Sequence, residues 1–231
     1  SREGAPVVSI VPDPDLVDRL AARRAAIEER IRVAAGAPSF AESGVRLIAV
    51  SKTHPAETIV AAAAAGFVEF GESYAVEFAA KAPEVGAAVR WHFIGQLQTN
   101  KVRVVAPWTD VYQSVDRPSL VAELAKRVSG ATVMVQVNLA DVEGRGGVSW
   151  QDAPGLIESA RAAGLSVVGA MGVAPLADDA TVAAAFGRLR SLCDAEALPE
   201  CSIGMSGDLE IAIAEGSTMV RVGTDIFGSR P

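Results

Sequence analysis

The chain of 231 residues is half hydrophobic by composition and carries a formal net charge of −7. This length is enough for one large core, and α/β barrels of this size form single domains. Its acidic and basic residues are interspersed, without the basic stripe that neutralises nucleic-acid phosphates, so we expect no nucleic-acid partner.

Cysteine content and hydropathy indicate where the protein resides. Cys193 and Cys201 are the only cysteines, too few for a disulfide framework, which is typical of a reducing cytosol. No apolar run reaches the roughly 18 residues of a membrane span, and residues 1–14 lack the basic-then-apolar order of a signal peptide. We therefore expect a soluble, cytoplasmic protein without a membrane partner, with a flexible tail at residues 1–12 and one domain over residues 13–231.

The first predicted element is a long helix from Asp13 to Ala35. Apolar residues recur along it at helical spacing, at Leu16, Leu20, Ile27 and Ile31. The charged run RRAAIEER supplies the polar face.

From residue 45 onwards, short β-rich runs alternate with alanine-rich helical runs, which is typical of repeated βα units around a parallel sheet. The predicted strands are Arg46–Val50, Val68–Gly71, Arg90–Ile94, Val111–Val115, Thr132–Val137, Ser166–Met171, Ser202–Met205 and Met219–Val222. The predicted helices between them are Pro55–Ala65, Tyr74–Lys81, Ser119–Val128, Asp152–Ala163, Ala180–Ala195 and Asp208–Ala214. Several begin near Pro, Ser or Asp, which favour a helix start.

This pattern predicts an α/β fold, a single (β/α)8 TIM barrel with an extra N-terminal helix, in preference to an open doubly wound sheet. The first βα turn, SKTHPA, contains no glycine and therefore no dinucleotide-binding fingerprint. In such barrels the functional residues follow the strands. The residues at these positions are mostly polar or glycine: Lys52, Glu72, Ser73, Gly95, Gln96, Ser114, Asp116, Asn138, Gly172, Ser206, Gly223 and Thr224.

Lys52 follows the apolar run VRLIAV, where desolvating an ammonium group is costly unless it is paired or neutral. One interpretation is a lysine that extends from the barrel rim into solvent. The other is a partly desolvated lysine with a lowered pKa, whose free amine can condense with an aldehyde to form a Schiff base. An aldehyde that carries a phosphate would also need an anion site on the same rim.

The C-terminal segment offers such an anion site. The turn Met205–Gly207 enters a helix after the seventh strand, and Gly223 and Thr224 enter another after the eighth. Free backbone N–H groups at such turns attract anions, and barrels often hold a phosphate there, although each turn alone also fits an ordinary helix start. Arg221 lies within the last strand, where a lone guanidinium is costly, so we expect it to contact a phosphate, a ring nitrogen or an acid.

The histidines are predicted to be structural. His92 lies in a strand, where an isolated histidine is more often hydrogen-bonded in the core than a general base, and His54 precedes Pro55 at a helix start. Neither has cysteine or acidic partners at ligand spacing, so we expect no metal site.

Longer motifs resemble one family along most of the chain. AVSKTHP, FGESYAVEF, WHFIGQLQTNK, SVD, QVNLADVEGRGGV and GMSGDLEIAIAEGSTMVRVGTDIFG resemble, in the same order, the signatures of the YggS/PROSC pyridoxal phosphate homeostasis proteins. The resemblance covers Val45 to Gly228. It implies the barrel of the alanine-racemase N-terminal domain, with residues 13–231 as a domain that binds pyridoxal 5'-phosphate (PLP).

The resemblance also implies site residues. By similarity, Lys52 forms the Schiff base with PLP. Four residues match the family's further contacts, chiefly to the phosphate: Ser206, Arg221, Gly223 and Thr224. Whether Ser206 or Arg221 faces the pyridine nitrogen stays open. The predicted cofactor-binding set is completed by three residues at or just after the ends of the fifth and seventh strands: Asn138, Met205 and Gly207.

Three positions depart from the family's pattern. Ser73 stands where the family often has Asn, and Gln96 where it often has Pro. Arg145 lies in a loop where many members have a lysine associated with cofactor transfer. Since arginine stays protonated, it cannot form a Schiff base, which argues against a transfer route through that loop.

The implied function is intracellular PLP homeostasis, in which a monomeric protein binds, buffers or delivers PLP, with PLP-dependent apo-enzymes as candidate partners. The alternative is a PLP-dependent amino-acid racemase. The resembled racemase uses a lysine and a tyrosine from a second domain as bases, whereas this chain has only Tyr74 and Tyr112 and ends three residues after Gly228. We therefore predict no catalytic residue and no turnover. A third interpretation, a barrel with an unrelated phosphate ligand, predicts no reducible adduct.

Overall fold

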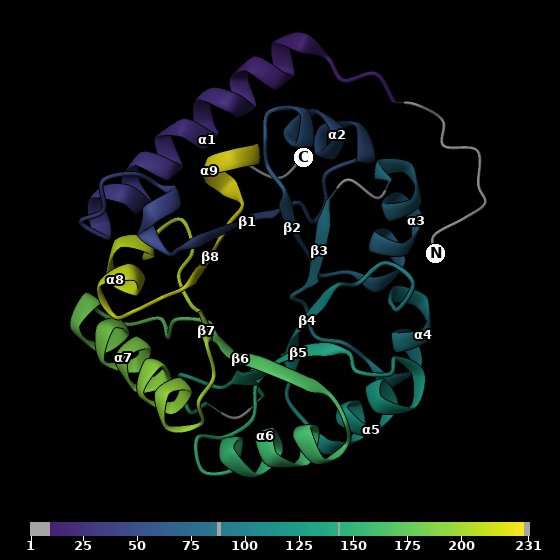
Figure 1. The fold of residues 1–231 in the computed structure, drawn as a ribbon, viewed down its shortest axis with the longest axis vertical. Coiled ribbons are helices and arrows are strands. Elements are labelled where there is room, and N and C mark those ends of the chain that lie inside the picture. The colour runs from purple at the N-terminus through teal and green to yellow at the C-terminus, as the bar shows by residue number, and fades with distance from the viewer. Residues whose placement is uncertain (1–9, 87–88, 143, 229–231) are drawn as a thin grey trace.

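The computed structural model describes residues 10–86, 89–142 and 144–228, so most of the predicted tail at 1–12 lies outside the described residues. Within them, eight strands close into a barrel whose neighbours follow chain order, and helices surround it (Figure 1). The predicted (β/α)8 barrel is confirmed. No helix in these ranges is both long enough and apolar enough to cross a membrane.

All neighbouring strands are parallel, and β8 closes the barrel against β1. The strands are β1 (Arg46–Val50), β2 (Glu69–Glu72), β3 (Arg90–Phe93), β4 (Val111–Val115), β5 (Thr132–Val137), β6 (Ser166–Gly172), β7 (Glu200–Ser202) and β8 (Met219–Val222). The α-helices are α1 (Pro14–Ala34), α2 (Ala56–Ala64), α3 (Ala75–Val85), α4 (Val102–Val105), α5 (Pro118–Arg127), α6 (Ala153–Ala162), α7 (Asp179–Ala195), α8 (Leu209–Ala214) and α9 (Thr224–Phe227). Two short 3-10 helices are η1 (Ala41–Ser43) and η2 (Thr99–Lys101).

The predicted bounds are confirmed to within one residue, with two exceptions. The seventh strand is Glu200–Ser202 rather than 202–205, because Gly204 adopts a φ of 97° that leaves the extended region. The Met205 N–H then donates to Asp208 Oδ1 at 2.6 Å, which turns the chain toward α8. Helix α3 continues to Val85 rather than ending at Lys81. The short helices α4 and α9 were not predicted as such.

Two apolar layers hold the barrel together. Side chains of alternating strand residues point to opposite faces, so one set fills the interior and the other packs under the helices. The interior cluster consists of Ile48, Val111, Met134, Met171 and Met219. The outer layer is larger and includes the fully buried rings of Phe70, Phe78, Trp91 and Phe93. This packing fixes the strand ends from which the functional loops leave.

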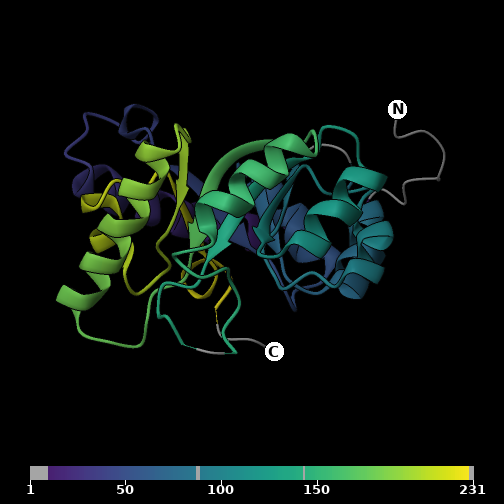
Figure 2. The same cartoon turned by 90° about the horizontal axis from the view of Figure 1, so that it is seen from below.

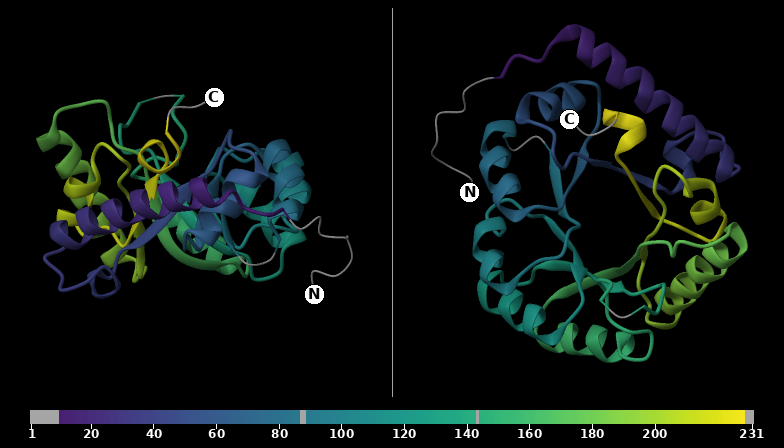
Figure 3. Two further views of the ribbon diagram at one scale, coloured as in Figure 1. Left: turned by 90° about the horizontal axis from the view of Figure 1, so that it is seen from above. Right: turned by 180° about the vertical axis from the view of Figure 1, so that it is seen from behind.

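The extra helix α1 lies outside the ring. It begins at Pro14, where the side chain of Asp13 accepts a hydrogen bond from the Asp15 N–H, and it buries Leu20, Ile27 and Ile31. It contacts α2, α8 and α9, as Figures 1 and 3 show. Helix α1 therefore braces the side of the barrel where the last βα units meet the first.

The loops after the strands project from one end of the barrel. Figure 2 shows the segments after β5 and β6 at the same end as the yellow segment that contains α9. The loop after β1 lies at this end too, because all the strands are parallel.

The loop between β1 and α2 is fixed by hydrogen bonds from Lys81 of α3. Lys81 Nζ donates to the backbone oxygens of Ser51 at 2.9 Å and His54 at 3.1 Å. It also forms ion pairs with Glu72 Oε1 and Glu77 Oε1, both at 2.7 Å. One buried ammonium group therefore ties both ends of this loop to β2 and α3.

The same loop contains a residue in an uncommon conformation. Thr53 has a φ of 69°, in the left-handed region that β-branched residues rarely adopt. Its N–H donates to Glu77 Oε1 at 2.6 Å, the oxygen that also pairs with Lys81. The loop conformation is therefore imposed by contacts with α3, and this conformation sets where the neighbouring Lys52 begins.

Among the charged groups around this loop, Glu72 has the fewest hydrogen-bond partners for its degree of burial. Its carboxyl group is fully buried, and Oε2 has no hydrogen-bond partner within the described residues. Ser51 Oγ donates to Oε1 at 2.6 Å. Burial raises the pKa of Glu72 to about 7, against the attraction of Lys81.

This raised pKa predicts how stability depends on pH. An acid whose pKa is raised by folding contributes stability below its unfolded pKa and loses that contribution as pH rises through the folded pKa. We expect the Glu72→Gln variant to gain free energy of unfolding relative to the parent as pH rises from 4.5 to about 7, by up to about 3 kcal/mol. Urea unfolding of both proteins at several pH values measures this difference. An equal difference at every pH would contradict the raised pKa.

Candidate functional site

The loops after β1, β2, β7 and β8 meet around one cavity of about 390 Å³. Seven of the eight predicted cofactor-binding residues line it: Lys52, Met205, Ser206, Gly207, Arg221, Gly223 and Thr224. The remaining walls are largely apolar and come from Val50, Ser73, Ile94, Met171 and Val173. Residues at opposite ends of the domain are therefore brought together because β8 pairs with β1.

The eighth predicted residue, Asn138, lies elsewhere. It lines a neighbouring cavity of about 280 Å³ together with Arg145. Its side-chain nitrogen donates to the backbone oxygen of Val142 at 2.8 Å, which supports the loop after β5. The two cavities share only Val173 among their described lining residues.

Arg221 is the most constrained charged group at the cavity. Its side chain is almost fully buried, and its guanidinium donates to the backbone oxygen of Ser202 at 2.7 Å, to Ser202 Oγ at 2.7 Å and to the backbone oxygen of Gly172 at 2.8 Å. All three acceptors are neutral, and no carboxylate in the described part of the chain forms an ion pair with it. Burial therefore lowers the pKa of Arg221 to about 10, although Asp208 opposes this shift.

A chain of buried hydrogen bonds orients Arg221 from below. Ser202 Oγ donates to Gln113 Oε1 at 2.7 Å, and Gln113 Nε2 donates to His92 Nδ1 at 2.8 Å. His92 is thereby left with its proton on Nε2, which donates to Glu69 Oε2 at 2.7 Å. Burial lowers the pKa of His92, which favours this neutral form. His92 is fully hydrogen-bonded in the barrel interior, which agrees with the predicted structural role.

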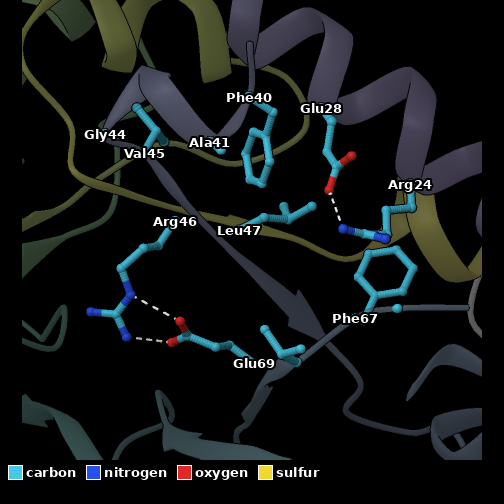
Figure 4. A pocket seen from close by; sticks show the side chains of 12 residues that line it. Arg24, Glu28, Phe40, Ala41, Gly44, Val45, Arg46, Leu47, Phe67 and Glu69 are labelled. Carbon is cyan, nitrogen blue, oxygen red and sulfur yellow. Dashed lines mark hydrogen bonds and ion pairs between the residues drawn. The ribbon is translucent and has the colours of Figure 1, made fainter. Parts of the chain in front are cut away.

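This series of hydrogen bonds ends at the opposite mouth of the barrel. Figure 4 shows Arg46 and Glu69 facing one another in a cavity of about 350 Å³, which is also lined by Phe40 and Phe67. Although burial opposes ionisation, hydrogen bonds from His92 and Arg46 hold the pKa of Glu69 at about 2. The ionised carboxylate of Glu69 is therefore the last acceptor in the series of hydrogen bonds that begins at Arg221.

The described residues contain no group of three or more His, Cys, Asp and Glu side chains placed to hold a metal ion. The polar side chains among the described residues that line the main cavity belong to one lysine, one arginine and three hydroxyl residues, Ser73, Ser206 and Thr224. This donor set suits an anion with a reactive carbonyl better than a cation.

Sequence reasoning missed the residues that hold the cavity's loops in place. Glu77 and Lys81 stand four residues apart, a spacing that predicts a salt bridge on a helix. Their further partners, Ser51 and Glu72, lie on other elements, so that spacing alone does not reveal the cluster.

Comparisons with known proteins agree with this geometry. The family described as "Alanine racemase, N-terminal domain" matches residues 23–231. The pyridoxal phosphate homeostasis protein of Pseudomonas aeruginosa is 40% identical over 215 residues, which cover 89% of this chain and 94% of that protein.

Two solved structures have the same fold. An unknown protein from Bifidobacterium adolescentis has a TM-score of 0.85 and 31% identity, covering 96% of this chain and 100% of that one. PipY of Synechococcus elongatus, solved with PLP bound, has a TM-score of 0.71 and 32% identity, covering 92% of this chain and 100% of that one. The chain therefore belongs to the alanine racemase N-terminal domain family and, within it, to the pyridoxal phosphate homeostasis proteins.

Proposed function

We propose that this protein binds PLP reversibly in the cavity that Lys52 and Arg221 line, and thereby takes part in PLP homeostasis. The observation that carries the proposal is a buried guanidinium with neutral partners, in the same cavity as a lysine and the turns at Ser206 and Thr224. PipY, which is 32% identical, has PLP in its solved structure. A cavity of about 390 Å³ also lies in the usual range for small-molecule sites.

The residues present fit the three parts of PLP. When bound, PLP supplies an aldehyde that reacts reversibly with amines. The unprotonated amine of Lys52 would form a carbon–nitrogen bond with the aldehyde carbon, and the aldehyde oxygen would leave as water. The turns at Ser206 and Thr224 would hold the phosphate through backbone N–H groups. Either Ser206 or Arg221 would face the pyridine nitrogen.

The second turn packs closely against the end of β1. A Cβ at Gly223 would lie 3.4 Å from both Val50 Cβ and the Val50 backbone oxygen, which is close van der Waals contact. Thr224, Met205 and Gly207 are exposed at the edge of the cavity. A cofactor held at such an edge can exchange with solvent, which suits buffering and delivery to PLP-dependent apo-enzymes in the cytoplasm.

The composition of the cavity favours binding over turnover. Racemisation needs a base on each face of the substrate α-carbon. Among the described lining residues, the basic side chains are Lys52 and Arg221. Arg221, with a pKa of about 10, stays protonated near neutral pH and is a poor base. Lys52 therefore has no evident second base opposite it in this part of the chain.

The assignment of Lys52 is tested by the Lys52→Ala variant. We expect it to lose both the PLP absorption band of the parent and the mass increase after borohydride reduction, while keeping weak, phosphate-dependent binding. The matched control is Lys126→Ala, because Lys126 is exposed on α5 and does not line the cavity. Peptide mapping of the reduced parent should find the modification at Lys52. A band retained in Lys52→Ala would contradict the assignment.

The absence of turnover is tested by polarimetry. We expect a panel of L-amino acids to lose optical rotation in the presence of the PLP-loaded protein no faster than with free PLP at the same concentration. This follows from the single available base among the described lining residues. A rate well above that of free PLP, lost in Lys52→Ala, would instead establish racemase activity.

A further inference from the structure

One arginine of α1 contacts both turns of the proposed phosphate site. Arg30 Nε donates to Glu210 Oε1 at 2.8 Å, and Nη2 donates to Glu210 Oε2 at 3.1 Å. Nη1 donates to Asp225 Oδ2 at 2.8 Å. Nη2 also donates to the backbone oxygen of Ser206 at 3.0 Å. A single planar guanidinium therefore binds two carboxylates and one backbone oxygen, which come from the segment after β7 and the segment after β8.

These acceptors belong to the segments that line the cavity. Ser206 itself lines the cavity after β7, and Glu210 lies in the first turn of the following α8. Asp225 directly follows Thr224, which lines the cavity after β8. Arg23 of α1 adds a second tie, because its Nη1 donates to the backbone oxygen of Ile226 at 2.7 Å. Helix α1 thus holds both segments from outside the barrel.

The two carboxylates would otherwise oppose the binding of an anion. A phosphate at the turns would lie near the negative charges of Glu210 and Asp225, and like charges repel. Arg30 sets a positive charge between these carboxylates, and the hydrogen bond from Arg30 lowers the pKa of Glu210, which keeps this carboxylate ionised and paired. One arginine offsets one of the two negative charges, so it weakens the repulsion that a phosphate at the turns would meet.

The same contacts also order the turns before a ligand arrives. Binding is weakened when loops must first be fixed in place, and contacts that fix them in advance remove this cost. We infer that Arg30 is a positioning residue for the phosphate of PLP, which joins the turns after β7 and β8 and offsets part of the charge of Glu210 and Asp225. This inference rests on the proposed function and assigns a role to α1.

The test compares two aldehydes that differ only in the phosphate. We expect Arg30→Met to raise the dissociation constant for PLP about fivefold, because it removes a partly exposed ionic bridge with two partners. The dissociation constant for pyridoxal, which lacks the phosphate, should stay unchanged. Absorption titration of the full chain measures both constants. Unchanged pyridoxal binding would also show that the variant is folded around Lys52.

The matched control is Arg32→Met. Arg32 lies on the same helix with the same exposed fraction of 35% and pairs with a carboxylate, but that partner, Glu29, belongs to α1 itself. We expect this variant to bind both aldehydes like the parent. Arg30→Lys keeps the positive charge but loses the planar group that donates to several acceptors at once. Its dissociation constant for PLP should therefore lie between those of the parent and Arg30→Met.

Two results would overturn the inference. The first is an unchanged PLP dissociation constant in Arg30→Met, and the second is an equal loss of affinity for PLP and pyridoxal. If Arg30→Met fails to fold, the same comparison is made with Arg30→Lys, where the same two results would count against it. A failure of the proposed function looks different, since the parent itself would then form no borohydride-reducible adduct with either aldehyde.

Discussion

The site is organised around a positive charge that the fold buries and does not neutralise. Arg221 points into the end of the barrel, where its hydrogen bonds go to two backbone oxygens and one hydroxyl. Desolvation of a guanidinium without a counter-charge is unfavourable, and the lowered pKa of Arg221 reports this cost. A ligand with negative charge or a ring nitrogen would offset it, which explains why such a residue occurs in the strand that borders the cavity.

The surrounding polar groups give this arginine one orientation. Ser202, Gln113 and His92 each have a defined direction of donation, and the direction is set by the ionised carboxylate of Glu69 at the far mouth. Buried polar networks that are fully satisfied specify one arrangement of the core. The interior of this barrel therefore combines a small apolar cluster with a continuous polar chain, instead of the purely aliphatic layers common in such barrels.

The sequence was informative where a residue conflicts with its local pattern. A lysine directly after an apolar strand and an arginine inside one are both unexpected, and this predicted Lys52 and Arg221 as residues of one rim. The barrel itself was predicted from the alternation of β and α patterns, because each strand and each helix shows its pattern within a short segment of sequence. The seventh strand was misplaced because Gly204 has a φ of 97°, and a glycine in the sequence is compatible with both positive and negative φ.

Contacts between distant segments were not accessible in this way. Arg30 and Glu210 are 180 positions apart, and either alone is typical of a solvated helix face. Asn138 illustrates the converse, because its position after a strand resembles that of Ser206, yet its loop folds over a separate cavity. A position after a strand places a residue at the correct end of the barrel, but the contacts of its loop decide which cavity it lines.

Closure of the barrel explains how two independent supports serve one site. The loop that carries Lys52 is held by α3 through Lys81, and the proposed phosphate turns are held by α1 through Arg30. These supports contact opposite ends of the domain sequence, and they meet only because Arg46–Ala49 pairs with Met219–Val222. The covalent and the ionic halves of the proposed site therefore need not be supported by the same contacts, and each half can be disturbed while the other stays in place. For the proposed reversible binding, this separation would let affinity be adjusted through the turns at Ser206 and Thr224 without moving Lys52.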